Sequence, residues 1–199
     1  MPAPLSVKKN NYTKNPKRSN VPTPQWLCHE IADLYPHARR VFDPCCGDGR
    51  LLLPFKERGV EVLGMDLAPK LKGALKQDFL EQSDVIEVDL VVCNPPFNLG
   101  VGKMLGSELF LRKIQEVCVP LGAPLEDLQI VLFCPMGFRL NQRQKSTRWR
   151  WLREQEQNGL RITSIMSLPL DVFDRVEFHS EVLFFNSPHL APHLFPCAI

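Results

Sequence analysis

The sequence lacks a long apolar run, a repeated cysteine spacing and a strong net charge. No apolar run approaches the ~18 residues of a membrane-spanning helix, and the N-terminus has no apolar core like that of a secretory signal. The seven cysteines show no repeated Cys-x-x-Cys pattern, and most lie in apolar stretches. We therefore expect a cytoplasmic protein with reduced, mostly buried thiols, rather than a membrane protein or a disulfide framework.

The net charge of +2 identifies no partner, but the charges are unevenly distributed. Residues 8–18 and residues 139–153 contain Lys and Arg without any acid. Residues 1–22 are rich in Lys, Asn, Ser and Pro, which predicts a flexible basic arm, either a solvated tail or a phosphate-binding segment. Residues 187–199 are rich in Pro and His and are predicted to be irregular. Residues 23–186 are long enough for one domain with a sizeable core.

Within residues 23–186, apolar strand patterns alternate with helical spacing. A helix is expected to begin at Thr23-Pro24, and two more span 50–56 and 103–119. Strands are predicted at 40–43, 60–66, 73–80, 88–93, 128–134, 160–168 and 180–185. Only residues 169–179 separate the last two, which is short for a parallel crossover. The pattern predicts an α/β fold with a mostly parallel seven-stranded sheet, helices on both faces and an antiparallel last strand.

The strand at 88–93 ends abruptly at Asn94-Pro95-Pro96-Phe97. Two prolines cannot continue a central strand, because they lack the N–H that the ladder needs. Asn94 and Phe97 are therefore expected at the carboxyl edge of the sheet, where open α/β sheets bind ligands. An amide, a stiff turn and an aromatic ring at that edge are suited to holding a planar polar group.

A glycine-rich turn, Asp43-Pro44-Cys45-Cys46-Gly47-Asp48-Gly49, joins the first predicted strand to a helix. Its glycines permit a tight turn and a close approach of the backbone to a ligand. Leu52 occupies the third small position of G-x-G-x-x-G, which argues against a dinucleotide pyrophosphate. Asp43 suits an ammonium group better than a phosphate. Asp66 ends the next strand about 20 residues after Gly47, where an acid can bind two ribose hydroxyls.

Asp78-Phe79 follows the third predicted strand and has two interpretations. Asp78 can accept a hydrogen bond from a ligand while Phe79 covers a ring face. Alternatively, Asp78 caps a helical turn and Phe79 belongs to the core.

Together these segments resemble S-adenosylmethionine-dependent methyltransferases, and within them the enzymes that methylate the N6 amino group of adenine and related amino groups. The resemblance spans about residues 22–186 and is carried by the glycine turn, Asp66, Asp78-Phe79 and Asn94-Pro95-Pro96-Phe97. The helix start Thr23-Pro24-Gln25-Trp26 resembles the cofactor-covering segment of the DNA adenine branch. We expect no large target-recognition domain, of the kind that many DNA adenine enzymes carry, within these 199 residues.

The resemblance implies S-adenosylmethionine as cofactor and a role for each matching residue. Asp43 and the backbone of Gly47 to Gly49 would face its methionine part, and Asp66 would bind its ribose hydroxyls. Asp78 would accept from its adenine amino group, with Phe79 near the ring.

On the substrate side, Asn94 and the Pro95 carbonyl would hold the target amino group, and Phe97 would stack on the target ring. The lone pair of such an amino group is delocalised into the ring, so two acceptors that favour a pyramidal nitrogen assist the transfer. A glutamine side-chain amide poses the same problem. The expected function is N6 methylation of adenine in DNA, with RNA adenine or protein glutamine methylation as alternatives and a non-catalytic nucleic-acid-binding subunit as a further one.

The basic segment 139–153 also contains Trp149 and Trp151. Arg with aromatics suits phosphates and unpaired bases, so Arg139, Arg143 and Arg148, together with Pro96, are predicted to contact the nucleic-acid substrate. The alternative is a solvated helix face with its tryptophans in the core.

Two other chemistries are disfavoured. Cytosine-C5 methylation needs a nucleophilic cysteine after a proline at the end of the fourth strand, whereas Cys93 precedes Asn94 and Cys134-Pro135 has the reverse order. A metal site could be drawn from His189, His193 and Cys197. Three ligands in an irregular tail make that site unconvincing, so no metal is expected.

Overall fold

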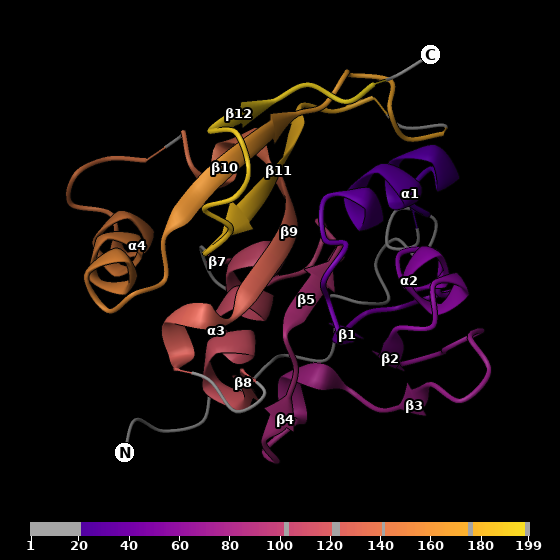
Figure 1. The fold of residues 1–199 in the computed structure, drawn as a ribbon. Helices are drawn as coiled ribbons and strands as arrows, with labels where there is room; N and C mark the ends of the chain where they lie inside the picture. Colours follow the sequence, from indigo (N-terminus) through magenta and orange to yellow (C-terminus); the bar gives the residue numbers. More distant parts are fainter. Residues whose placement is uncertain (1–20, 102–103, 121–123, 141, 175–176, 198–199) are drawn as a thin grey trace.

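The computed structural model describes residues 21–101, 104–120, 124–140, 142–174 and 177–197 (Figure 1). Most of the predicted basic arm, residues 1–20, lies outside the described residues. The central sheet has the strand order β12-β10-β11-β9-β5-β1-β2-β3. Its strands are β1 (Arg40–Asp43), β2 (Glu61–Asp66), β3 (Leu75–Lys76), β5 (Leu90–Cys93), β9 (Gln129–Pro135), β10 (Ile162–Ser167), β11 (Ser180–Phe185) and β12 (His193–Leu194).

The sheet confirms the predicted fold class. Strands β2, β1, β5 and β9 pair in parallel, whereas β11 is antiparallel to both of its neighbours, β9 and β10. The short connection 169–179 therefore makes the predicted antiparallel return. All seven predicted strands are present, although the third is limited to Leu75–Lys76.

The prediction of an irregular tail after residue 186 was incomplete. Residues His193 and Leu194 form β12, which pairs in parallel with Ile165 and Met166 of β10. Ser164 also donates its hydroxyl to the carbonyl of Ala191. The tail thus covers what would otherwise be the open edge of β10, and its proline-rich sequence has no strand alternation that would have indicated this.

Helices cover both faces of the sheet, so its central strands β5 and β9 are buried on both sides. In β5, Leu90 and Val92 pack with α1 (Gln25–Asp33) and α2 (Leu53–Glu57), whereas Val91 and Cys93 face α3 (Gly106–Val117). All four β5 residues are fully buried. This explains the continuous apolar run in the sequence, which a strand with one solvent-facing side would not have.

The remaining elements are short, apart from one outer helix. They are the 3₁₀ turns η2 (Phe79–Glu81), η3 (Leu125–Asp127) and η4 (Met136–Phe138), the strand pairs β4 (Ile86–Glu87) with β8 (Cys118–Val119) and β6 (Gly100–Val101) with β7 (Met104–Leu105), and the helix α4 (Thr147–Gln157). In Figure 1, α4 lies at the outer side of the molecule, beyond α3 and β10.

The cysteines match the expectation of buried, reduced thiols. Five of the seven are buried, Cys45 is half-buried and Cys197 is exposed, and all are free. Within the described residues, no helix is long and apolar enough to cross a membrane, and no three His, Cys, Asp or Glu side chains are grouped as a metal site would require.

Candidate active site

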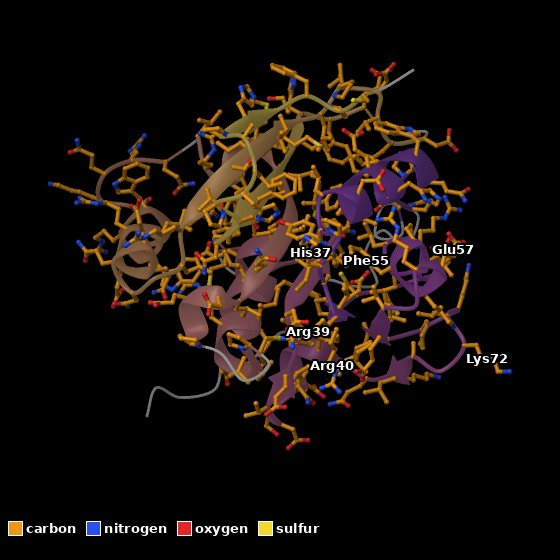
Figure 2. All side chains as sticks on the ribbon, in the orientation of Figure 1. His37, Arg39, Arg40, Phe55, Glu57 and Lys72 are labelled. Carbon is orange, nitrogen blue, oxygen red and sulfur yellow. The ribbon has the colours of Figure 1, made fainter. Side chains whose placement is uncertain are left out.

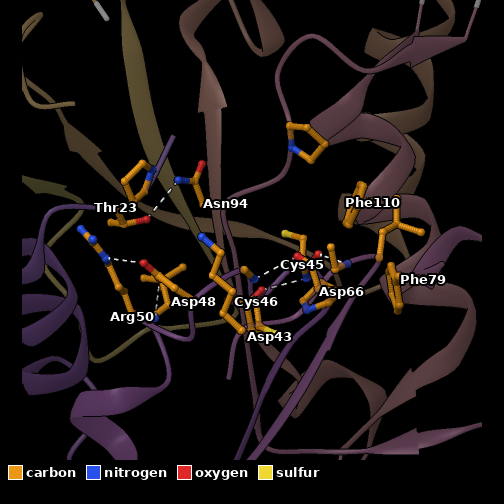
Figure 3. A pocket seen from close by; sticks show the side chains of 18 of the residues that line it. Thr23, Asp43, Cys45, Cys46, Asp48, Arg50, Asp66, Phe79, Asn94 and Phe110 are labelled. Carbon is orange, nitrogen blue, oxygen red and sulfur yellow. Dashed lines mark hydrogen bonds and ion pairs between the residues drawn. The ribbon is translucent and has the colours of Figure 1, made fainter. Parts of the chain in front are cut away.

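A cavity of about 550 Å³ lies at the carboxyl ends of β1, β2 and β5 (Figure 3). This volume is in the range of small-molecule and cofactor sites. Eight of the residues predicted from the sequence line it: Thr23, Asp43, Gly47, Asp66, Asp78, Phe79, Asn94 and Pro96. They come from segments far apart in the chain and meet here because parallel strands end at one edge of the sheet.

Asp43, the last residue of β1, is almost completely buried at the floor of this cavity. Its Oδ1 accepts a hydrogen bond of 3.0 Å from the backbone N–H of Cys45. Burial raises the pKa of Asp43 to about 7, and the nearby charge of Asp66 acts in the same direction. A ligand that brings a positive charge to Asp43 would favour its ionised form.

Asp66 ties the end of β2 to the glycine turn. Its Oδ2 accepts the N–H of Gly47 at 2.9 Å, and its Oδ1 accepts the N–H of Ala68 at 2.8 Å. The carboxylate is thereby held in one orientation on the cavity wall. Each oxygen keeps a second lone pair, so two adjacent hydroxyl groups of a ligand can still donate to it.

The two glycines of the turn have different roles. Gly47 has a φ of +52°, and no atom lies within 4 Å of the place where a Cβ would be. It lines the cavity. Gly49 is not among the lining residues, and a Cβ there would come within 2.8 Å of Leu71 Cδ1. With a φ of +86°, Gly49 is needed for the turn and its packing.

For Asp78 and Phe79 the structure shows the capping and core roles, and leaves the ligand-binding role a prediction. Asp78 Oδ1 accepts the N–H of Leu80 at 3.0 Å and so caps η2. Phe79 is buried, with its ring centroid 5.6 Å from those of Phe42 and Phe110. Both residues nevertheless line the cavity, so a structural role does not exclude contact with a ligand.

Asn94 follows β5 directly and is oriented by Thr23. Its Nδ2 donates to Thr23 Oγ1 at 3.0 Å, a contact between residues 71 positions apart (Figure 3). Thr23 is buried just before α1. Since the amide nitrogen is engaged in this bond, the Oδ1 of Asn94 is the atom left to accept from a ligand. The sequence predicted both residues for the site but not their contact.

The rest of the Asn-Pro-Pro-Phe turn lies partly outside the cavity lining. Pro96 lines the cavity, whereas Pro95 is buried and Phe97 is half-buried beside it. The Phe97 ring packs edge-on against Phe178, with centroids 5.1 Å apart, and Phe178 stacks on Phe173. Phe178, in the connection between β10 and β11, therefore packs against the Phe97 ring.

The predicted arginine contacts lie away from the cavity lining. Arg139 pairs with Glu181 at 2.9 Å and Arg148 pairs with Glu108 at 2.6 Å, and both carboxylates are buried. Arg143 is exposed to solvent. No residue of α4 is buried, but its two tryptophans differ: Trp149 is exposed, whereas Trp151 is half-buried and packs against the core.

Several lining residues were not selected from the sequence. Leu67 and Lys70 follow β2, so their position just after the strand-end acid Asp66 could have indicated them. The Lys70 backbone N–H also donates to the carbonyl of Gly47 at 2.8 Å. Phe110 gave no separate signal, since it belongs to the apolar stripe of α3. The others are Val21, Pro22, Pro44, Cys45, Cys46, Asp48, Arg50, Leu51, Ala68 and Gln77.

No family model matches the sequence, and no curated protein matches it. Solved structures do resemble the fold. The methyltransferase subunit of a type I restriction-modification system from Streptococcus thermophilus has a TM-score of 0.60 at 14% identity, over 85% of this chain and 45% of that one. The M protein of the type I restriction enzyme EcoKI has a TM-score of 0.59 at 17% identity, over 82% of this chain and 43% of that one.

A third similar structure is magnesium protoporphyrin IX methyltransferase from Synechocystis, which was solved with bound S-adenosylmethionine. Its TM-score is 0.53 at 15% identity, over 81% of this chain and 78% of that one. The chain spans less than half the length of either restriction subunit. These likenesses define the fold: it is the Rossmann-like fold of S-adenosylmethionine-dependent methyltransferases.

Proposed function

We propose that this protein transfers a methyl group from S-adenosylmethionine to the exocyclic N6 amino group of adenine in nucleic acid, with DNA as the first substrate to test. The observation that carries the proposal is the hydrogen bond between Asn94 and Thr23. It leaves an amide oxygen available at the rim of a cavity whose wall carries Asp43, Asp66 and Asp78.

The donor set of the cavity fits the cofactor. Asp43 is a buried acid suited to an ammonium group, and Asp66 offers lone pairs to two adjacent hydroxyls. Asp78 keeps an oxygen that can accept from an amino group at the adenine end. When bound, S-adenosylmethionine supplies an electrophilic methyl group on a sulfonium. The excess of acids along this wall suits a ligand that carries positive charge.

Asn94 and Pro95 act on the target amino group. The Asn94 Oδ1 and the Pro95 carbonyl accept its two N–H groups, which favours a pyramidal nitrogen with its lone pair directed into the cavity. This is positioning and electrostatic stabilisation by fixed acceptors. No strong base is required before transfer, because the nitrogen becomes acidic only after it has gained the methyl group.

Neither acceptor distinguishes adenine from a glutamine amide. Nucleic acid is favoured by the cationic segment 139–153 and by the likeness to two type I restriction subunits. In a duplex the target base must leave the stack, at a cost of about a few kcal/mol. Stacking against an aromatic ring such as Phe97 offsets about 1–3 kcal/mol of that cost.

The test is methyl transfer from labelled S-adenosylmethionine to duplex DNA, single-stranded DNA, RNA and a protein extract, followed by nucleoside and amino-acid analysis. We expect N6-methyladenine in at least one nucleic acid. Label found only in methylglutamine would show that the substrate is a protein glutamine amide and not adenine. Cofactor binding without N6-methyladenine on any nucleic acid tried would contradict the proposal.

A further inference from the structure

The segment from Arg139 to the end of α4 contains cations of two kinds. Arg139 and Arg148 are turned inward, where they pair with Glu181 and Glu108, whose side chains are only 4% and 2% exposed. A buried carboxylate without a partner is costly, and Arg139 is the partner of Glu181. Glu108 is shared by Arg148 and Arg112, so Arg148 links the segment to α3. Arg139 and Arg148 are therefore poor candidates for binding a ligand.

The other four cations, Arg143, Lys145, Arg150 and Arg153, are exposed. Among the described residues, no acid forms an ion pair with any of these four. Arginines elsewhere do pair with acids: Arg39, Arg40, Arg50, Arg58 and Arg112. In the part of the chain that the structure describes, the exposed arginines that form no ion pair lie on this segment, apart from Arg161. Exposed lysines without an ion pair also occur at Lys56, Lys70, Lys72 and Lys76, but acids are interspersed among them, whereas residues 139–153 contain no acid.

Neither packing nor helix electrostatics explains these charges. None of the residues of α4, all of which the structure describes, is buried. Arg143 and Lys145 precede α4 and Arg150 lies in its first half, whereas Glu154 and Glu156 lie towards its end. This is the reverse of the arrangement that the helix dipole favours. Trp149, 37% exposed, lies between Arg148 and Arg150 in sequence and offers an aromatic face among the cations.

The segment starts at the same edge of the sheet as Asn94. Strands β5 and β9 are parallel, with Cys93 opposite Leu132, so the segments that follow them both leave the sheet at its carboxyl edge. The backbone N–H of Met136 donates to the carbonyl of His179, which keeps η4 at that edge. The edge thus has an acidic cavity at the ends of β1 and β2, and a cationic segment that begins at the end of β9.

We propose that Arg143, Lys145, Trp149, Arg150 and Arg153 form a docking surface, called here the cationic surface, for the phosphodiester backbone of nucleic acid. The four cations contact successive phosphates, and Trp149 stacks on an unpaired base. The delivery of an adenine to Asn94 rests on the proposed function, whereas the docking itself does not.

The experiment measures the binding of fluorescein-labelled duplex DNA, single-stranded DNA and single-stranded RNA of one sequence by anisotropy, over a range of salt concentrations. The triple variant Arg143→Gln, Lys145→Gln, Arg150→Gln is compared with wild type. The control Lys56→Gln, Lys72→Gln, Lys76→Gln removes the same charge from exposed lysines. Figure 2 shows Lys72 on the opposite side of the molecule from α4.

We expect the cationic-surface variant to bind the preferred nucleic acid at least about tenfold more weakly than wild type. Its slope of log affinity against log salt should be smaller by about two to three units, one for each phosphate that the variant no longer neutralises. The control should bind within about twofold of wild type. An equal decrease of affinity in both triple variants, or no binding of any of the three nucleic acids by wild type at low salt, would overturn the proposal.

Trp149→Ala separates stacking from charge. It should weaken binding of single strands while leaving the salt slope unchanged, and an unchanged affinity would overturn the stacking role. A parallel titration with S-adenosylmethionine tests the proposed function by itself. A protein that binds nucleic acid through this surface without binding the cofactor would refute the methyltransferase proposal and leave the docking surface intact.

Discussion

The two sides of the sheet edge differ in how their polar residues are held. On the side proposed to bind the cofactor, Asp66 accepts the N–H of Gly47 within one strand–turn–helix–strand unit. On the side proposed to bind the target, the partners come from distant segments, as Glu108 does for Arg148 and Phe178 for Phe97. The position of a side chain that is held by a local turn can be predicted from sequence. The partner of a long side chain that contacts a distant segment cannot.

The largest expected effect is on the acceptor between the two sides. Replacing Asn94 by Ala should lower the methyl-transfer rate by about 10²–10³-fold, because the reacting amino group then lacks one of its two fixed hydrogen-bond acceptors. The dissociation constant for S-adenosylmethionine, measured by calorimetry, should stay within about twofold. Asn158→Ala, which changes an exposed asparagine at the end of α4 away from the cavity lining, is the matched control and should transfer at the wild-type rate.

Asp66→Ala should have the opposite signature. It removes two charge-assisted hydrogen bonds to a ligand together with the anchor of Gly47, so cofactor affinity should fall about 10–100-fold. The rate at saturating cofactor should change much less. Asp84→Ala removes an exposed acid away from the cavity and should leave the affinity unchanged. If Asp66→Ala kept wild-type affinity, the assignment of this carboxylate to the ribose would be wrong.

Thr23 connects the two sides, so its variants sharpen the comparison. Thr23→Val keeps the shape but removes the hydroxyl that receives the Asn94 amide, and should lower the transfer rate about tenfold through misorientation of that amide. Thr23→Ser keeps the hydroxyl and should restore most of the rate. Equal single-turnover rates for Thr23→Val and wild type would show that the orientation of the Asn94 amide does not depend on its hydrogen bond to Thr23.

The smallest expected effect is a pH dependence of cofactor binding that arises from Asp43. Its pKa of about 7 lies above the ordinary 3.8, so this carboxyl lowers the stability of the ligand-free protein as pH rises from about 4 to about 7. A bound ammonium group favours the ionised form. Cofactor binding should therefore release a proton below pH 7. The affinity for the cofactor should fall by up to about tenfold for each unit by which the pH is lowered below 7.

Calorimetry in two buffers of different ionisation enthalpy measures that proton directly. Asp43→Asn should bind more weakly at about pH 7.5 and should show no proton release just below the pKa of the wild-type carboxyl. If the wild-type protein bound the cofactor without releasing a proton just below the pKa of Asp43, no positive group of the ligand would lie beside Asp43.

Most of the fold could be predicted because its elements obey local rules. The fully buried β5 has the unbroken apolar run of a parallel strand, and the short connection before Ser180 implied an antiparallel return. The strand at His193 could not be predicted, since its position depends on the open edge of β10 rather than on its own sequence pattern.

The candidate site divides in the same way. Asp43, Gly47 and Asp66 line the cavity because each occupies a strand end or a tight turn that the sequence defines. The charge of Arg139 and Arg148 was evident, but their buried partners were not, because Glu181 and Glu108 look in sequence like ordinary surface acids. Phe110 likewise reaches the cavity from a helix stripe that resembles any core-facing stripe.

A crystal structure with S-adenosylhomocysteine tests the central claim most directly, that one cavity presents a cofactor to Asn94. The account predicts both ribose hydroxyls within hydrogen-bond distance of Asp66, the amino group beside Asp43, and the sulfur facing the Asn94 side of the cavity. A ligand bound with its ribose away from Asp66, or an empty cavity at saturating ligand, would contradict the account.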